Sequence, residues 1–241
     1  MPDVWLMSLL GVASLFAFTV AGVAGFGGGV ILMPALVLVF GPKEAIPIVS
    51  VAALLAAISR TGLNWRDISW PVVKWHSIGA VPISILASFL FVLAPPTFLG
   101  RALGILLLLF VVFRHTHWGR ERNLSLRKFA LVGAGTSFVG GFLGVPGPLR
   151  APFFLAYGLT GMAYVGTSSA AMLFAQTPKL FVYRGNDLLG TEVLTVGLAL
   201  GVMGFLASYI GRWIAKRASA RLFQYLVEGL LVVGGVLLLF A

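Results

Sequence analysis

Cysteine is absent from this chain, and acidic residues are few. The lack of cysteine in all 241 residues excludes disulfides, thiolate metal sites and thiol redox chemistry. Asp and Glu number only 7 against 17 Lys and Arg, and charged residues of both signs make up only 10% of the chain. Because 59% of the residues are hydrophobic, the composition lies far outside that of soluble domains and predicts an integral membrane protein.

Uniformly apolar runs fill much of the sequence. Runs such as 102–113 and 226–240 are long enough, at about 1.5 Å per helical residue, to cross most or all of a hydrocarbon core about 30 Å thick. They lack the alternation of outer-membrane β-barrels, so we predict an all-α fold, a polytopic membrane helix bundle. The helices expected in the first half span about 4–24, 30–40, 44–59, 70–93 and 97–113, with a polar turn over 60–69.

The basic residues lie mostly in short loops between the apolar runs. The net charge of +10 therefore indicates orientation by the positive-inside rule, not nucleic-acid binding. Attraction of anionic substrates is a second interpretation of the same excess of basic over acidic residues. The first apolar run follows Met-Pro-Asp without a basic segment or a small-residue cleavage site, so we expect a retained helix and not a signal peptide.

Glycine interrupts the first predicted helix. The stretch 21–34, AGVAGFGGGVILMP, carries Gly25 and Gly27–Gly29, while 9–23 and 30–40 contain no charged residue. Glycine at this density predicts a break in the helix. Unpaired backbone groups at membrane depth are tolerated only where protein or a wet cavity covers them, so the break suggests a site. Close helix packing through small residues is the alternative.

The second half of the chain resembles the first. Residues 45–59 align with 163–177 at a constant offset of 118, which also pairs Pro34 with Pro152. The stretch 140–148, GGFLGVPGP, stands where the first glycine break stood. Broken helices at equivalent positions of two halves point to the binding site of a transporter.

We divide the chain into a first transmembrane repeat over 1–113, a basic connecting loop over 114–127 and a second repeat over 128–241. Five segments in each half would make the repeats inverted, whereas four would make them parallel. We prefer the inverted arrangement, because it leaves fewer basic residues on the wrong side of the membrane. The side expected in the cytoplasm then carries Arg60, Arg66, the 114–128 loop, Arg212, Lys216, Arg217 and Arg221, and Lys179 and Arg184 are exceptions.

Burying a charged side chain at membrane depth costs free energy, so each charged residue placed there is a candidate functional residue. Arg150 lies between Pro148 and Pro152 without an acidic neighbour in sequence, so we expect it to hold an anion; snorkelling to the surface is the alternative. Short helices that begin at the breaks direct N–H groups and positive dipole ends into the gap, which favours anions. Carbonyls freed by the same breaks favour sodium or water, so the sign of the ligand stays open here.

The candidate substrate-binding residues combine the break glycines with Arg150 and with hydroxyl and amide side chains on the repeated helices. They are Gly27, Gly28, Gly29, Ser50, Gly147, Arg150, Thr167, Ser168, Ser169 and Gln176. Bonds from Ser and Thr to their own helix carbonyls are the competing explanation for the hydroxyls. Arg60 and Lys179 are candidates for gates or for anchors at the lipid headgroups, and we favour anchoring.

Other titratable residues suggest no enzyme. The three histidines, His76, His115 and His117, lack a carboxylate cluster, so surface roles are expected, and neither a metal nor a cofactor is predicted. No nucleophile triad, phosphate loop or dinucleotide fingerprint occurs, which predicts that the protein is not an enzyme. The candidates for proton coupling are Asp67, Asp187, Glu192 and Glu228, although local pairing with neighbouring arginines is the better explanation for the first two.

The motifs GVAGFGGGVILMPALVLVFG, GGFLGVPGPLRAPFFLAYGL and AYVGTSSAAMLFAQTPKL resemble the TauE/SafE sulfite exporter family over nearly the whole chain. The resemblance implies secondary export of small sulfur-containing anions, such as sulfite, sulfoacetate or related sulfonates, by a multi-pass protein of the bacterial inner membrane. It also implies coupling to an ion gradient, of protons or sodium. The expected partners are a small anionic substrate and the lipid bilayer, with no nucleic acid and with a homodimer left open.

Two alternatives to this function stay open, a passive anion channel and an exporter of a non-sulfur carboxylate. One departure from the family pattern also bears on the substrate. The second motif of the family usually resembles the first as a run of glycines, whereas here Pro146, Pro148 and Arg150 interrupt it.

Overall fold

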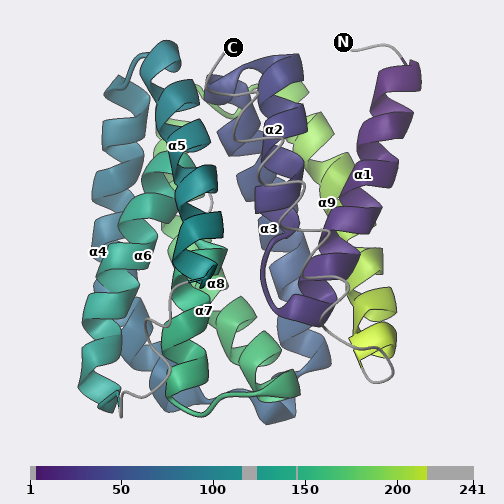
Figure 1. Ribbon diagram of the computed structural model, residues 1–241. Coiled ribbons are helices and arrows are strands. Elements are labelled where there is room, and N and C mark those ends of the chain that lie inside the picture. Colours follow the sequence, from purple (N-terminus) through teal and green to yellow (C-terminus); the bar gives the residue numbers. More distant parts are fainter. Residues whose placement is uncertain (1–3, 116–123, 145, 216–241) are drawn as a thin grey trace.

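The computed structural model describes residues 4–115, 124–144 and 146–215, and these residues form helices without any strand (Figure 1). The predicted all-α fold is confirmed. The helices are α1 (Val4–Ala24), α2 (Gly28–Phe40), α3 (Pro42–Leu63), α4 (Trp70–Leu93), α5 (Pro96–His115), α6 (Phe129–Leu143), α7 (Gly147–Ala156), α8 (Gly161–Gly185) and α9 (Thr191–Ala215). Short 3₁₀ turns, η1 (Trp65–Asp67) and η2 (Leu126–Lys128), precede α4 and α6.

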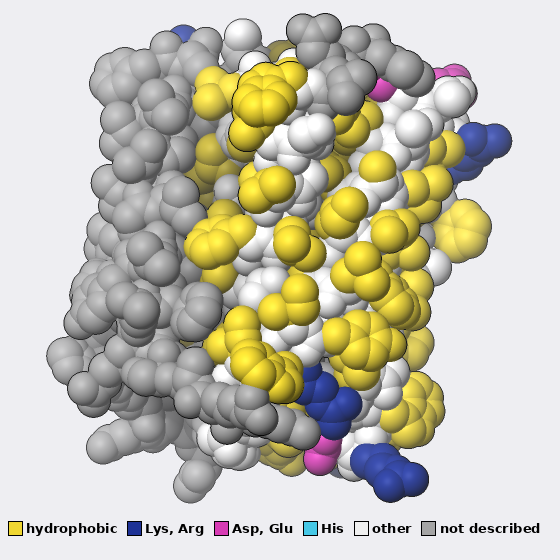
Figure 2. All heavy atoms as spheres, turned by 90° about the vertical axis from the view of Figure 1, so that its right-hand side faces the viewer, with side chains coloured by type: hydrophobic (Ala, Val, Ile, Leu, Met, Phe, Trp, Pro, Cys, Tyr) yellow, Lys and Arg dark blue, Asp and Glu magenta, His cyan; other side chains and the backbone are white. Residues whose placement is uncertain are grey.

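Several helices have the length and apolarity of membrane spans. Among the described residues, these spans are Trp5–Val23, Pro42–Leu63, Trp70–Leu93 and Thr191–Ile214. Figure 2 shows one face of the bundle, where hydrophobic side chains are spread over the described surface and charged side chains lie near the two ends. This distribution is that of a protein whose waist is surrounded by lipid.

Both predicted helix breaks are present. α1 ends at Ala24, and the chain turns back into α2 through Gly25 and Gly27, whose φ angles of 75° and 109° are unfavourable for residues with a side chain. α6 likewise ends at Gly144, with φ 82°, before α7 begins at Gly147. Because of the turn, α2 packs beside α1 and α3 (Figure 1).

α3 is longer than the sequence predicted. The helix continues to Leu63, so the polar turn expected over 60–69 begins only at Asn64. The physical reason is burial, since Arg60 and Thr61 face the protein interior and not water. A polar sequence that is buried in this way does not end a helix.

The helices run in two opposite directions. α1 and α9 are parallel, because Ser14 Oγ of α1 donates to the Leu200 carbonyl of α9 and Gly22 approaches Gly211 further along both helices. α3 follows the same direction along α9. α1, α3 and α9 therefore form one set.

The second set runs antiparallel to the first. Arg60 of α3 contacts Ser169 of α8, while Asn64, further along α3, meets Gly166, which is earlier on α8. α4 and α6 run in the same direction as α8. α4, α6 and α8 therefore oppose α1, α3 and α9.

The helices that an offset of 118 residues would relate are α1 with α6, α3 with α8 and α4 with α9. Each of these pairs runs in opposite directions, as an inverted arrangement requires. The halves also interlock, since α1 packs against α9 and α6 packs against α4. That the two halves are sequence repeats stays a prediction.

Candidate functional site

The two helix breaks meet inside the bundle. A Cβ atom added to Gly147, at the start of α7, would lie 3.0 Å from Cβ of Phe26 and 3.7 Å from the backbone nitrogen of Gly27. Ser168 Oγ of α8 donates to the Gly25 carbonyl at 3.4 Å and so connects α8 to the first break. Glycine at 147 allows this close approach of the two backbones.

A cavity of about 40 Å³ lies where the breaks meet. We call it the central cavity, and its volume is enough for a few water-sized groups at about 10–15 Å³ each. Its wall includes Gly25–Val30 from the first break and Gly144, Pro146 and Gly147 from the second. Residues of α1, α3, α7 and α8 complete the wall. It is the place at which both halves of the chain present backbone and side chains to one small volume.

The helices α2 and α7 begin at the wall of this cavity. Neither N-terminus is capped by a side chain. In α2 the first helical bond runs from Ile31 N to the Gly27 carbonyl at 2.8 Å, so the N–H groups of Gly28, Gly29 and Val30 have no intrahelical acceptor. The positive end of each helix dipole therefore lies at the cavity.

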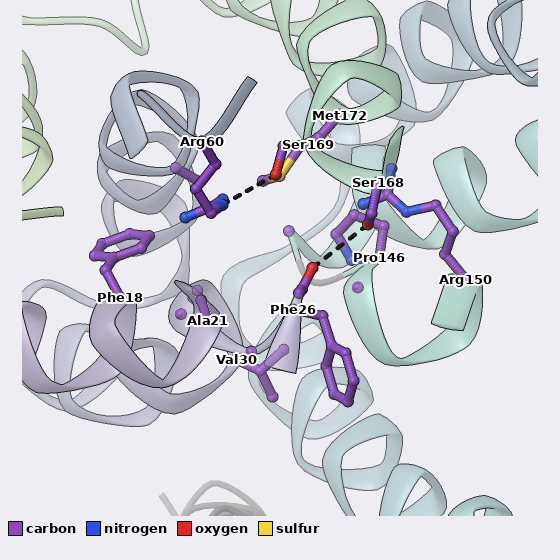
Figure 3. Close-up of a pocket in the computed structure, with 17 residues that line it drawn as sticks. Phe18, Ala21, Phe26, Val30, Arg60, Pro146, Arg150, Ser168, Ser169 and Met172 are labelled. Atoms are coloured by element: carbon purple, nitrogen blue, oxygen red, sulfur yellow. Dashed lines mark hydrogen bonds between the residues drawn. The ribbon is translucent and has the colours of Figure 1, made fainter. Parts of the chain in front are cut away.

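Two arginines add full positive charges. Arg60 of α3 is 4% exposed and Arg150 of α7 is 2% exposed, and both line the central cavity. Figure 3 shows them on opposite sides of it, with Ser168 and Ser169 between them. Arg60 Nε donates to Ser169 Oγ at 3.0 Å.

These charges lack acidic partners. Within the part of the chain that the structure describes, no carboxylate pairs with Arg60 or Arg150, and one Arg60 terminal nitrogen and Arg150 Nε have no hydrogen-bond acceptor. A buried charge without a partner is costly, and the cost is relieved by a bound counter-ion. The two buried guanidinium groups and the two helix N-termini at this cavity therefore favour an anion over a cation.

A second, smaller cavity adjoins the first. It has a volume of about 10 Å³ and shares Pro146, Arg150 and Met172 with the central cavity. Gln176 and Lys179 of α8 lie on its wall. We call it the Lys179 cavity.

Comparison with protein-family models matches residues 10–238 to the family described as Sulfite exporter TauE/SafE. The chain belongs to the TauE/SafE family. Membership implies a membrane exporter of sulfite or other sulfur-containing anions, and it confirms the resemblance and the membrane-transporter class that the motifs predicted. Comparison with curated proteins and with solved structures gave no match.

In this TauE/SafE protein, most of the predicted binding residues come together. Those that line the central cavity are Gly27, Gly28, Gly29, Gly147, Arg150, Ser168 and Ser169, and Arg60 joins them. Gln176 and Lys179 line the adjoining cavity. The structure thus groups residues that are more than 100 positions apart in the sequence.

Two of the predicted residues line neither cavity. Ser50 Oγ donates to the Ile46 carbonyl of its own helix at 2.6 Å. Thr167 Oγ1 accepts a hydrogen bond from Ser69 N at 2.9 Å and so fixes the turn before α4. Ser50 therefore fits the alternative of a bond to its own helix carbonyl, whereas the partner of Thr167 lies outside its helix.

Three expectations about charged and titratable residues change. Arg60 and Lys179 are buried within the protein, so neither reaches the lipid headgroups as an anchor would. His76 was expected at the surface, which is wrong, since it is 1% exposed between α4 and α6, with Nε2 3.3 Å from Thr136 Oγ1. The reason is Gly133 of α6, whose missing side chain lets α4 approach closely at His76.

Three of the four carboxylates proposed for coupling lie away from the site. Asp67, Asp187 and Glu192 are exposed, while Glu228 lies outside the described residues, as do His117 and the His115 side chain. No group of three His, Cys, Asp or Glu residues that could hold a metal occurs in the described part of the chain.

Sequence reasoning missed several residues of the wall, namely Phe18, Phe26, Pro146 and Met172. Apolar side chains of this kind occur throughout a membrane protein, so nothing marks those that face a cavity. Pro146 is the exception, because it lies inside the second glycine-proline motif.

Proposed function

We propose that this protein is a secondary transporter that exports small sulfur-containing anions, such as sulfite, sulfoacetate or related sulfonates, across the bacterial inner membrane by alternating access. The proposal is carried by one observation. Two buried arginines without acidic partners and two uncapped helix N-termini surround a single small cavity. An oxyanion is the ligand that satisfies such a set of donors.

The donors suit a sulfite or sulfonate group. Its oxygens accept hydrogen bonds from several directions, and guanidinium groups can donate two parallel N–H bonds to such a group. The N–H groups of Gly28 and Gly29 approach from α2, and Arg60 and Arg150 approach from opposite sides of the cavity. The apolar side chains of Phe18 and Phe26 complete the wall and exclude water.

The helix breaks supply the flexible points for alternating access. α2 and α7 are short, begin at glycine-rich turns and belong to opposite halves of the chain. Small rotations at these turns would open the cavity toward one end of the bundle and close it toward the other. A proton or sodium gradient supplies the driving force in this proposal.

The first prediction concerns Arg150. Replacing Arg150 with Ala removes one of the two buried charges at the central cavity, so the affinity for sulfite and sulfoacetate should fall by at least about tenfold. Transport into proteoliposomes should be lost. Binding to the purified protein is measured by calorimetry, and Arg184→Ala, which removes an exposed arginine outside the cavities, should bind as the wild type does.

Size-exclusion chromatography and the melting temperature establish that Arg150→Ala is folded. Unchanged binding and flux in a folded Arg150→Ala protein would refute the central anion site.

A passive anion channel or a carboxylate exporter would use the same charges. Flux that ignores imposed proton and sodium gradients would identify the channel, and tighter binding of acetate or malonate than of sulfoacetate would identify the carboxylate exporter.

A further inference from the structure

Lys179 lies beyond the central cavity on α8. It follows Ser169, a residue of the central wall, by ten positions, which corresponds to about 15 Å along a helix. Its side chain is 1% exposed and lines the Lys179 cavity together with Gln176, Ser84 and Ser137. The central site does not require a cation at this distance.

The amino group of Lys179 has spare donor capacity. Nζ donates to the Gly140 carbonyl at 2.9 Å, and a lysine ammonium carries three N–H donors. No carboxylate in the described part of the chain pairs with it. The neighbouring Gln176 is 3% exposed, and its Nε2 has no hydrogen-bond acceptor. A buried amide donor without an acceptor, beside an ammonium group with N–H donors to spare, is an arrangement that an oxyanion would satisfy.

Buried cationic side chains line both of the adjoining cavities. Arg60 lines only the central cavity, Lys179 lines only the smaller one, and Arg150 lines both. Because α3 and α8 are antiparallel, Arg60 and Lys179 approach from the C-terminal portions of helices that point to opposite ends of the bundle. Their positions differ by 119, one residue from the offset that relates the halves.

We propose that the Lys179 cavity is a second oxyanion site, through which the substrate passes between the central cavity and the end of the bundle where α8 ends. This inference rests on the proposed function. A volume of about 10 Å³ holds one water-sized group, so the site is closed in this structure. Substrate replaces the Gly140 carbonyl as the Lys179 acceptor when α7 moves away, and Gln176 donates a second hydrogen bond.

The test separates binding from transport. Lys179→Met keeps the length of the side chain and removes the ammonium group, whereas Lys179→Arg keeps a charge. Binding of sulfite and sulfoacetate to purified protein reports on the central site, and flux into proteoliposomes reports on the whole path. We expect Lys179→Met to bind within about threefold of the wild type but to transport at least about tenfold more slowly, and Lys179→Arg to recover part of the flux.

Lys43→Met is the matched control. Lys43 also donates to backbone carbonyls, those of Phe91 and Val92 at 2.8 and 2.7 Å, yet it lines neither cavity. Its loss should therefore leave transport near the wild-type rate. If Lys179→Met does not fold, Gln176→Leu takes its place and should also slow flux without weakening binding.

Three outcomes overturn the inference. Wild-type flux in Lys179→Met would show that no anion needs this site. Loss of binding as large as in Arg150→Ala would place Lys179 in the central site. Equal loss of flux in Lys179→Met, Lys179→Arg and Lys43→Met would indicate a structural role alone. In each case the wild type and Arg150→Ala still test the proposed function, which fails separately if the wild type binds neither anion.

Discussion

At the scale of single residues, Gly28 shows how little space the central site leaves. A Cβ atom at this position would lie 2.5 Å from Cδ1 of Phe18, a side chain that is itself buried. Gly28→Leu would therefore push the Phe18 ring or fill the cavity, and it would block the N–H group that α2 offers. We expect sulfite binding to weaken by at least about tenfold.

The control for Gly28→Leu is Gly62→Leu, because a Cβ atom at Gly62 of α3 meets nothing within 4 Å. Calorimetric titration of both purified variants with sulfite makes the comparison. Near-normal affinity in Gly28→Leu would mean that the glycine serves only helix packing. Loss of affinity in both variants would point to a general loss of structure.

The sequence identifies some of these residues better than others. Glycines and an arginine in an apolar run stand out, and Gly28 and Arg150 both line the central cavity. Ser50 and Ser168 have the same chemistry and differ only in the helix face they occupy, which depends on packing that no single sequence displays. Arg60 was misjudged because the end of its helix was placed too early.

At the scale of elements, close backbone contacts hold α4 against α6. A Cβ atom at Gly133 of α6 would lie 2.0 Å from the His76 carbonyl oxygen, and one at Gly79 of α4 would lie 1.9 Å from the Ala130 carbonyl oxygen. Backbone atoms cannot rotate away as a flexible side chain can. Without a strong hydrophobic effect between helices in lipid, such small-residue contacts supply much of the packing energy.

Gly133→Ala should therefore destabilise the bundle by about 1–3 kcal/mol, the usual cost of overpacking. Gly135→Ala is the control on the same helix, since its Cβ meets nothing within 4 Å. It should be as stable as the wild type or more so, because alanine favours helix over glycine. Thermal unfolding in detergent measures both variants, and equal melting temperatures would contradict the close contact.

The helix pairs themselves could not be predicted. Glycine breaks and apolar lengths are local features of the sequence, and both breaks appear where they were expected. The association of α1 with α9 and of α4 with α6 joins segments that are distant in the chain. It depends on glycines such as Gly22 and Gly211, which do not differ in sequence from glycines at exposed positions.

At the scale of the whole molecule, the direction of the helices assigns the basic residues to two ends. α3 and α8 run antiparallel, so Arg66, just after α3, and Arg184, in the last turn of α8, lie at opposite ends of the bundle. Among the residues that the structure describes, the exposed basic residues on the Arg66 end are Arg66, Lys74, Arg127 and Lys128, and those on the Arg184 end are Arg101 and Arg184. The positive-inside rule therefore predicts that the Arg66 end lies in the cytoplasm.

The absence of cysteine makes this orientation directly testable, because a single introduced thiol has no background. Arg66 and Arg184 are both exposed and are paired by the offset of 118 residues. A membrane-impermeant maleimide added to intact cells should label Arg184→Cys and leave Arg66→Cys unlabelled until the membrane is permeabilised. Labelling of both variants from the same side would be incompatible with antiparallel α3 and α8 across the bilayer. Labelling of Arg66→Cys alone in intact cells would mean that the orientation is the reverse, so that the Lys179 cavity leads toward the cytoplasm.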